Sequence, residues 1–346
     1  MKRFLMTGLA AVLAFAASTG IAAADPAERT TLCHRDDDGS FRPITVSERA
    51  EEAHRAHGDA APGEPVPGME GKVFDEDCNP QDAPLTGYEV LESPPMPFGD
   101  GGFGGWSCPA GKVVIGGGFE ATDPVSVSAP GTPGSVWPHH TFGSEEYGWV
   151  VQDDIDGSPN TITIHVICAD EPAGYEVVES SPMAFGDGGF GGWSCPAGKV
   201  VLGGGSEATD PVAVSAPGTP GSVWPHHTFG ADEFGWVVRD DPNGAPNAIT
   251  IHVICLAPVA GHEVVNSSPM AFGDGGFGGW SCPAGRVVTA GGFDASDTVQ
   301  VSAPGTPASV WPHHTFGSEE YGWVVQDDQN GAGNTITVYA VCAETS

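Results

Sequence analysis

Basic side chains are scarce in this sequence. Twelve Lys and Arg stand against 45 Asp and Glu, which gives a formal net charge of -33. From Gly87 to Ser346 the basic residues are Lys112, Lys199, Arg239 and Arg286 alone. No basic stripe can meet a phosphate backbone, so nucleic acid and anionic membranes are poor partners. Cations, or a salty medium, suit such an acidic surface better.

Long apolar runs are also lacking. The longest opens the chain, where Lys2 and Arg3 precede an apolar stretch that ends in Ala22, Ala23 and Ala24. This pattern predicts a secretory signal peptide over residues 1–24. Nothing after it approaches the roughly 18 to 20 apolar residues of a membrane helix. We therefore expect a secreted, extracellular protein without membrane insertion.

Patterns of catalytic residues are missing too. The chain has no GxSxG motif, and its cysteines fall into pairs that leave no candidate thiol nucleophile. The run Gly99–Gly104 matches GxGxxG, but Gly105-Trp106-Ser107-Cys108-Pro109 follows it where a nucleotide site needs a helix. We read this run as a tight loop and expect no enzyme.

What is present is a repeat of 87 residues, with copies at 87–173, 174–260 and 261–346. Each copy holds short strand patterns separated by Gly, Pro, Asp and Asn, so we expect six or so strands per repeat and an all-β fold. On the last strand we place His165, His252 and Tyr339 at one solvated position. The short linkers allow sandwich-like units in a row, which we favour, or a closed pseudo-threefold prism.

The eight cysteines follow the same organisation. Each repeat has one pair 60 residues apart, and the segment 25–86 holds a fourth pair. Even numbers in an exported chain predict disulfides. The expected bridges are Cys33–Cys78, Cys108–Cys168, Cys195–Cys255 and Cys282–Cys342.

Residues 25–86 form a separate small α+β module with a Pro/Gly-rich linker. A short helix is expected over 47–58, with Ser47 as N-cap and Gly58 at its end. His54 and His57, at i and i+3, share a helix face, and His34 and Asp59 are further candidate ligands. We predict a possible divalent metal site, with Zn²⁺ as the ion, against the alternative of solvated surface histidines.

The acidic pairs Asp153-Asp154, Asp240-Asp241 and Asp327-Asp328 are each followed by Asn160, Asn247 or Asn334. Oxygen ligands in loops suit Ca²⁺, but no EF-hand loop is present. Turn formation is the favoured interpretation, and Ca²⁺ binding is the alternative.

The heptapeptide VWPHHTF occurs once per repeat. Its Trp could stack on sugar rings while its His residues hydrogen-bond hydroxyls, whereas a role in core or loop packing is the favoured alternative. The candidate ligand-binding residues are Trp137, His139, His140, Trp224, His226, His227, Trp311, His313 and His314.

Two resemblances cover nearly the whole mature chain. The pattern TLCHRDDDGSF…HRAHGD…CNP resembles a small module of bacterial secreted proteins. The elements CPAGKVVIGGG and ITVYAVCA are similar to uncharacterised bacterial exported repeats, and GGWSCPAG with a DD-then-N element resembles the vitelline membrane outer layer proteins, which implies a three-sheet prism.

We therefore expect a non-catalytic secreted repeat protein for extracellular or cell-surface binding or adhesion, with carbohydrate recognition as a possible activity and a glycan or other extracellular polymer as partner. The alternative is an acidic structural matrix or coat component that assembles with Ca²⁺.

Overall fold

The computed structural model describes residues 29–99, 101–122, 125–126, 148–153, 159, 161–186, 189–209, 212–217, 235–240, 246, 248–273, 276–296, 299–304, 322–327 and 333–346. The expected signal peptide and all three VWPHHTF segments lie outside these residues. The described chain is mostly β-strand, which confirms the all-β prediction, and α1 is its one helix.

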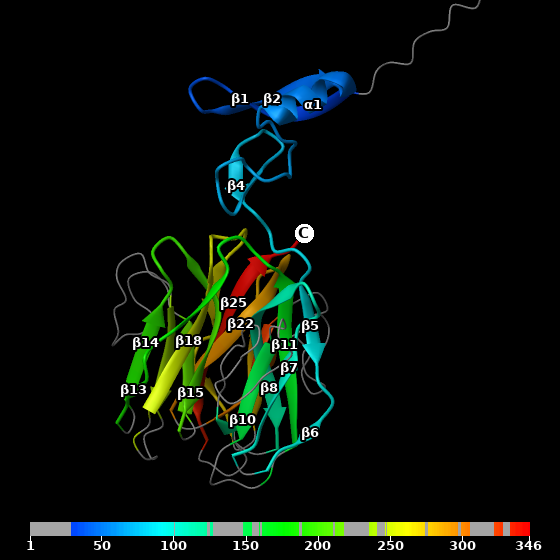
Figure 1. Ribbon diagram of the computed structural model, residues 1–346. Coiled ribbons are helices and arrows are strands. Elements are labelled where there is room, and N and C mark those ends of the chain that lie inside the picture. Colours follow the sequence, from blue (N-terminus) through cyan, green and yellow to red (C-terminus); the bar gives the residue numbers. More distant parts are fainter. Residues whose placement is uncertain are drawn as a thin grey trace, which may run out of the picture.

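The N-terminal module comes first and is followed by the three repeats (Figure 1). The module holds β1 (Arg29–Arg35), β2 (Phe41–Ser47), α1 (Glu48–Ala56), β3 (Lys72–Phe74) and β4 (Pro80–Asp82). Its strands form two hairpins, β1 with β2 and β3 with β4. A small core of Cys33, Ala60, Val66, Phe74 and Cys78 joins them.

Each repeat contains seven described strands. Repeat 1 has β5 (Glu89–Glu92), β6 (Met96–Pro97), β7 (Phe103–Ser107), β8 (Lys112–Ala121), β9 (Val125–Ser126), β10 (Gly148–Asp153) and β11 (Thr161–Asp170). Repeat 2 has β12 (Glu176–Glu179), β13 (Met183–Ala184), β14 (Phe190–Ser194), β15 (Val200–Ala208), β16 (Val212–Pro217), β17 (Gly235–Asp240) and β18 (Ala248–Leu256). Repeat 3 has β19 (Glu263–Asn266), β20 (Met270–Ala271), β21 (Phe277–Ser281), β22 (Arg286–Ala295), β23 (Val299–Pro304), β24 (Gly322–Asp327) and β25 (Thr335–Glu344).

Two antiparallel sheets make up each repeat. In repeat 1, β11 pairs with β5 and β6 along one edge and with β8 along the other, while β7, β10 and β9 form the second sheet. The indole of Trp149 on β10 lies on Gly117 of β8, where an added Cβ would be 2.5 Å from the ring. A glycine is therefore required at this contact between the two sheets. The run Gly99–Gly104 is a turn only in its first half, where the amide of Gly102 donates to Gly99 O at 2.6 Å. Strand β7 begins at Phe103, inside the run that we read as a loop, because these residues pair with β10.

All four predicted disulfides are present: Cys33–Cys78, Cys108–Cys168, Cys195–Cys255 and Cys282–Cys342. In each repeat the bridge joins the segment after the FGGWS strand to the last strand, and both sulfurs are buried. Four bridges indicate an oxidising compartment. Among the described residues, no helix has the length and apolar character needed to cross a membrane.

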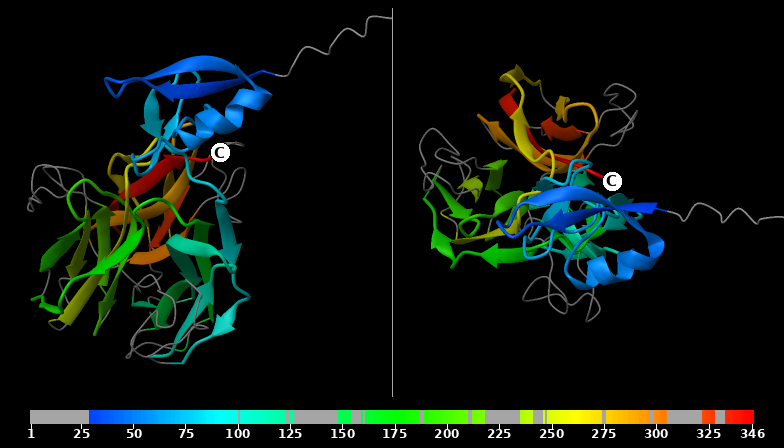
Figure 2. Two further views of the ribbon diagram at one scale, coloured as in Figure 1. Left: turned by 45° about the horizontal axis from the view of Figure 1, so that its top comes forward. Right: turned by 90° about the horizontal axis from the view of Figure 1, so that it is seen from above.

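The three repeats contact one another in every pairing. The central strands β8, β15 and β22 contact one another in all three pairings, β16 of repeat 2 packs on β22 of repeat 3, and β23 of repeat 3 packs on β8 of repeat 1. The view from above shows the three repeats around a common centre (Figure 2). Repeats 1 and 3 are therefore in contact through β22, β23 and β8, a contact that linker length alone could not predict.

Hydrogen bonds between equivalent residues link the same three pairs of repeats, and each one ends on a backbone carbonyl of another repeat. The donors and acceptors are Tyr88 Oη to Val288 O (2.8 Å), Tyr175 Oη to Val114 O (2.8 Å) and His262 Nε2 to Val201 O (2.7 Å). Buried apolar side chains of all three repeats form one continuous core.

The linker from the module forms backbone hydrogen bonds with the C-terminal ends of repeats 2 and 3. The amide of Leu85 donates to Glu344 O (2.9 Å), and the amide of Ala260 donates to Ala83 O (2.9 Å). Leu85 itself is buried. These short parallel pairings attach the linker to the segment after β18 in repeat 2 and to the end of β25 in repeat 3.

Closest approach at the centre occurs where Gly116 of β8 faces repeat 3. An added Cβ there would lie 1.9 Å from the carbonyl oxygen of Thr289. Thr289 is fully buried, and its hydroxyl donates to Leu202 O of repeat 2 at 3.0 Å. The backbone of repeat 3 at Thr289 therefore occupies the space that a side chain at position 116 of repeat 1 would need.

We predict that Gly116→Ala destabilises the whole protein by at least about 2 kcal/mol, because an oversized group in a packed core displaces backbone. Urea unfolding followed by tryptophan fluorescence measures this. Gly99→Ala is the matched control, since an added Cβ at Gly99 meets nothing within 4 Å. Equal midpoints for the two variants would show that the repeats do not meet at this point.

We expected the position shared by His165, His252 and Tyr339 to be solvated, and for the two histidines this prediction is wrong. His165 and His252 are each 6% exposed, because β11 and β18 are covered on both faces. Across the strand pairs, His165 faces Glu92 and His252 faces Glu179, whereas Tyr339 of repeat 3 faces Asn266. Burial lowers the pKa of both histidines to about 4.

These two histidines should make stability fall in acid. Their folded pKa lies below the ordinary value of about 6.5, so the unfolded chain takes up protons first as the pH drops. The free energy of unfolding is therefore highest above about pH 7. It declines between roughly pH 6.5 and 4, by up to about 3 kcal/mol per histidine. The double variant His165→Tyr/His252→Tyr copies repeat 3 and should lose less stability between pH 7.5 and 4.5 in urea titrations. Identical losses for the variant and the parent protein would contradict this assignment.

Candidate metal site

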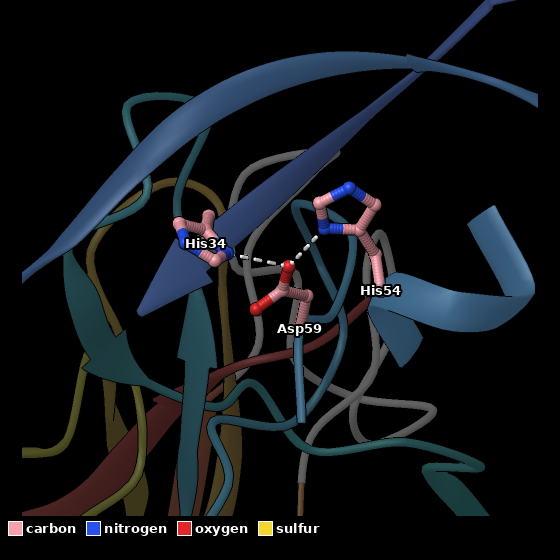
Figure 3. Close-up of side chains that lie close together, drawn as sticks. All are labelled: His34, His54 and Asp59. Carbon is pink, nitrogen blue, oxygen red and sulfur yellow. Dashed lines mark hydrogen bonds and ion pairs between the residues drawn. The ribbon is translucent and has the colours of Figure 1, made fainter. Parts of the chain in front are cut away.

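Three of the four predicted metal ligands converge in the N-terminal module. His34 lies on β1, His54 lies in the last turn of α1, and Asp59 follows the helix (Figure 3). One ligand atom from each residue lies within 4.8 Å of the corresponding atoms of the other two. The site is therefore built from two secondary-structure elements and the turn after the helix.

The end of the helix determines where Asp59 lies. Gly58 adopts φ +94°, and its amide donates to Arg55 O at 3.0 Å, while the amide of Asp59 donates to His54 O at 3.2 Å. This pair of bonds is a Schellman motif, which glycine favours because it needs a left-handed residue. The reversal of the chain places the Asp59 carboxylate beside the His54 ring. At the other end of the helix, Ser47 occupies the predicted N-cap position, but its side chain makes no capping bond.

Strand β1 brings the second histidine. The amide of Cys33 donates to Ala60 O at 2.7 Å, so the residue after Asp59 pairs with the residue before His34. The Cys33–Cys78 disulfide holds this strand in the module core. The conformation of the site therefore depends on a backbone bridge and a covalent bond that lie directly beside it.

One carboxylate oxygen receives both imidazoles. Asp59 Oδ2 accepts from His34 Nδ1 at 2.8 Å and from His54 Nδ1 at 2.9 Å. The Asp59 side chain is 2% exposed, whereas the two histidine side chains are about one-third exposed. Burial by itself raises the pKa of Asp59, but the hydrogen bonds from His34 and His54 lower the pKa below its ordinary value. The carboxylate is thus ionised and buried beneath two rings that solvent reaches.

His57, the fourth predicted ligand, does not join this group. It lies exposed at the C-cap, where its amide donates to His54 O at 3.0 Å. Spacing along the helix placed it on the face of His54, but the side on which β1 packs decides which neighbour His54 meets. That neighbour is His34.

Two imidazoles and a carboxylate are a ligand set typical of Zn²⁺ and related transition metals. Tetrahedral Zn²⁺ with bonds of about 2.1 Å separates its ligand atoms by about 3.4 Å. The His34 and His54 nitrogens lie 2.8 and 2.9 Å from the Asp59 oxygen. Each nitrogen would therefore have to move about half an ångström away from the carboxylate oxygen to reach that separation.

In the acidic loops, the described Asp and Asn residues form hydrogen bonds within the protein. Asn334 Nδ2 donates to Asp327 Oδ1 at 2.6 Å, and the amide of Asp327 donates to Gly276 O at 2.7 Å. Asp153 and Asp240 make the same backbone bond to Gly102 and Gly189. These contacts favour turn formation, as interpreted from the sequence. Asp154, Asp241, Asp328, Asn160 and Asn247 lie outside the described residues.

The sugar-binding candidates cannot be placed. Trp137, His139, His140, Trp224, His226, His227, Trp311, His313 and His314 all lie outside the described part of the chain. Other aromatic side chains that the sequence analysis did not select are exposed on the FGGWS strands: Phe103, Trp193, Phe277 and Trp280. The signal that could have identified them was the same FGGWS pattern in every repeat.

In comparisons with known proteins, no protein-family model and no curated sequence matches this chain. The resemblances to bacterial exported repeats and to the vitelline membrane outer layer proteins therefore remain predictions.

Proposed function

We propose that this chain is an exported, non-catalytic binding protein whose N-terminal module holds a Zn²⁺ ion. The observation that carries the proposal is the single buried Asp59 oxygen shared by two imidazole nitrogens from different elements. Such convergence requires β1, α1 and the turn after the helix to be placed together, and it keeps an ionised carboxylate in a buried position.

The state of the cysteines supports a binding role rather than catalysis. All eight cysteines are in disulfides, so the chain offers no thiol nucleophile. Zinc held by three protein ligands keeps one position open, which a side chain of a binding partner or a water molecule can fill. Because the side chains of His34 and His54 are about one-third exposed, we expect this open position to face solvent.

We also infer that the three repeats fold as one pseudo-threefold prism that carries the module, rather than as three independent domains. The cyclic hydrogen bonds of Tyr88, Tyr175 and His262 and the shared core support this inference. A rigid body of this kind presents three equivalent outer surfaces in an extracellular setting, where adhesion to a polymer benefits from repeated contacts.

The metal site predicts a clear ranking of variants. His34→Ala, His54→Ala and Asp59→Asn should each weaken Zn²⁺ binding at least tenfold in competition with a chromophoric chelator, because each removes one of three ligands. His57→Ala should leave the affinity unchanged, since His57 lies outside the group. Zn²⁺ at about 100 times its dissociation constant should stabilise the wild type by about 2.7 kcal/mol.

The same four variants also serve as a control for Zn²⁺ binding elsewhere in the chain, because binding at another site would persist in all of them. If His34→Ala and His57→Ala bind Zn²⁺ equally well, Asp59 serves only to orient the two rings and the proposal is wrong. Circular dichroism confirms that each variant retains its fold before the comparison is made.

A further inference from the structure

The outer sheet of every repeat ends in an edge strand that bears aromatic side chains on its surface. Among the described strands, β14 pairs only with β17, and its counterparts β7 and β21 pair only with β10 and β24. Trp193 and Trp280 are each 40% exposed, although large aromatic side chains are normally buried in a domain of this size. Phe103 and Phe277 are also exposed at the first position of their strands.

Packing within the sheet explains this exposure. Trp193 on β14 pairs directly with Trp236 on β17, and Trp236 is only 1% exposed. The inner tryptophan fills the core against Gly204, where an added Cβ would be 2.5 Å from the ring. The core is therefore complete without Trp193, which remains available at the surface.

An open cleft surrounds Trp193. It is lined by Val178, Glu179, Gly192, Trp193, Ser194 and Pro196. The Glu179 side chain stands at its margin and is 71% exposed. The cleft thus combines a flat aromatic face with a hydroxyl, a carboxylate and the backbone of a glycine, which is the mixture of apolar and polar groups found in small-ligand sites.

We propose that these aromatic edge strands bind a neutral polysaccharide, one sugar residue on Trp193 and another on Trp280. The apolar face of a pyranose ring stacks on an indole, and Glu179 and Ser194 accept or donate hydrogen bonds to its hydroxyls. A net charge of -33 disfavours anionic polymers. This leaves neutral and cationic partners to compare.

Comparison of the repeats favours the neutral partner. The position of Glu179 is Glu92 in repeat 1 and Asn266 in repeat 3. A cation site would lose its counter-charge in repeat 3, whereas a sugar site keeps a group that forms hydrogen bonds. What the three positions share is hydrogen-bonding capacity, and charge is not preserved.

Trp193 and Trp280 occupy equivalent positions in repeats 2 and 3, and two such positions on one protein suit a long polymer. The cleft at Trp193 is open, so a single sugar should bind weakly. A chain that reaches two sites gains affinity through effective concentration, by 10²-fold or more where the span fits. Short oligosaccharides should therefore bind much less tightly than the polymer.

The test uses the full exported chain and a panel of insoluble neutral polysaccharides, including cellulose, chitin and a β-1,3-glucan, in pull-down and affinity electrophoresis. The wild type should bind at least one of them, and Trp193→Ala/Trp280→Ala should bind at least tenfold less. Trp193→Tyr/Trp280→Tyr retains a stacking face and should restore most of the binding. Met69→Ala, another exposed apolar side chain but in the module, is the control and should bind as the wild type does.

The Glu179→Gln variant distinguishes a site for a neutral polysaccharide from a site for a cationic ligand. It should retain polysaccharide binding, because an amide still forms hydrogen bonds, but a site for a basic peptide would lose affinity. Retention by polylysine that depends on Glu179, with no retention by any polysaccharide, would overturn the proposal, as would equal binding by the wild type and the double alanine variant. Repeating the assay with EDTA keeps this result independent of the Zn²⁺ site, because the aromatic strands share no residue with it.

Discussion

The close approach of three central strands is the constraint on which the rest of this structure depends. Strands β8, β15 and β22 meet where Gly116 and Gly203 leave no side chain between backbones, and Ala290 adds a single methyl group. An 87-residue unit would bury only about 60 to 65% of its unfolded surface by itself. Joining three units around one centre places the inner faces of all three in a common core. The disulfides then stabilise each unit internally, chiefly by restricting the unfolded chain.

The proposed binding surfaces, on the outer sheets and in the module, lie outside this close central contact. The tryptophans that complete the core, Trp149, Trp236 and Trp323, lie on the second strand of each outer sheet, and their partners on the edge strands are more exposed. The module is attached through the linker around Leu85 and keeps its own small core and disulfide. Its His34, His54 and Asp59 are consequently positioned by local contacts and do not rely on the repeats.

Small differences between copies show where the repeats tolerate change. Repeat 3 has Tyr339 in place of the buried His and Asn266 in place of its facing Glu. Repeat 2 carries Arg239, which pairs with Asp294 of repeat 3 at 3.0 Å, where the other repeats have glutamine. Both changes occur in contacts between strands, and the disulfide of each repeat is retained.

The sequence by itself determined the repeat boundaries, the long strands, the four disulfide pairs and the short helix ending at Gly58. It did not predict the FGGWS strands β7, β14 and β21, because their glycines are typical of turns. Spacing, alternation and cysteine parity are local or covalent properties, so they can be read without knowing the fold. Four residues were predicted as candidate metal ligands, and three of them lie together in the structure, because histidine spacing on a helix and a nearby carboxylate restrict the choices. Only the tertiary structure decided that His34 and not His57 completes the group, since β1 approaches one side of the helix. It alone decided that His165 is buried, that Trp193 is exposed and that repeat 3 contacts repeat 1. Each of these depends on which surfaces of distant segments meet, and no pattern within a single strand records that.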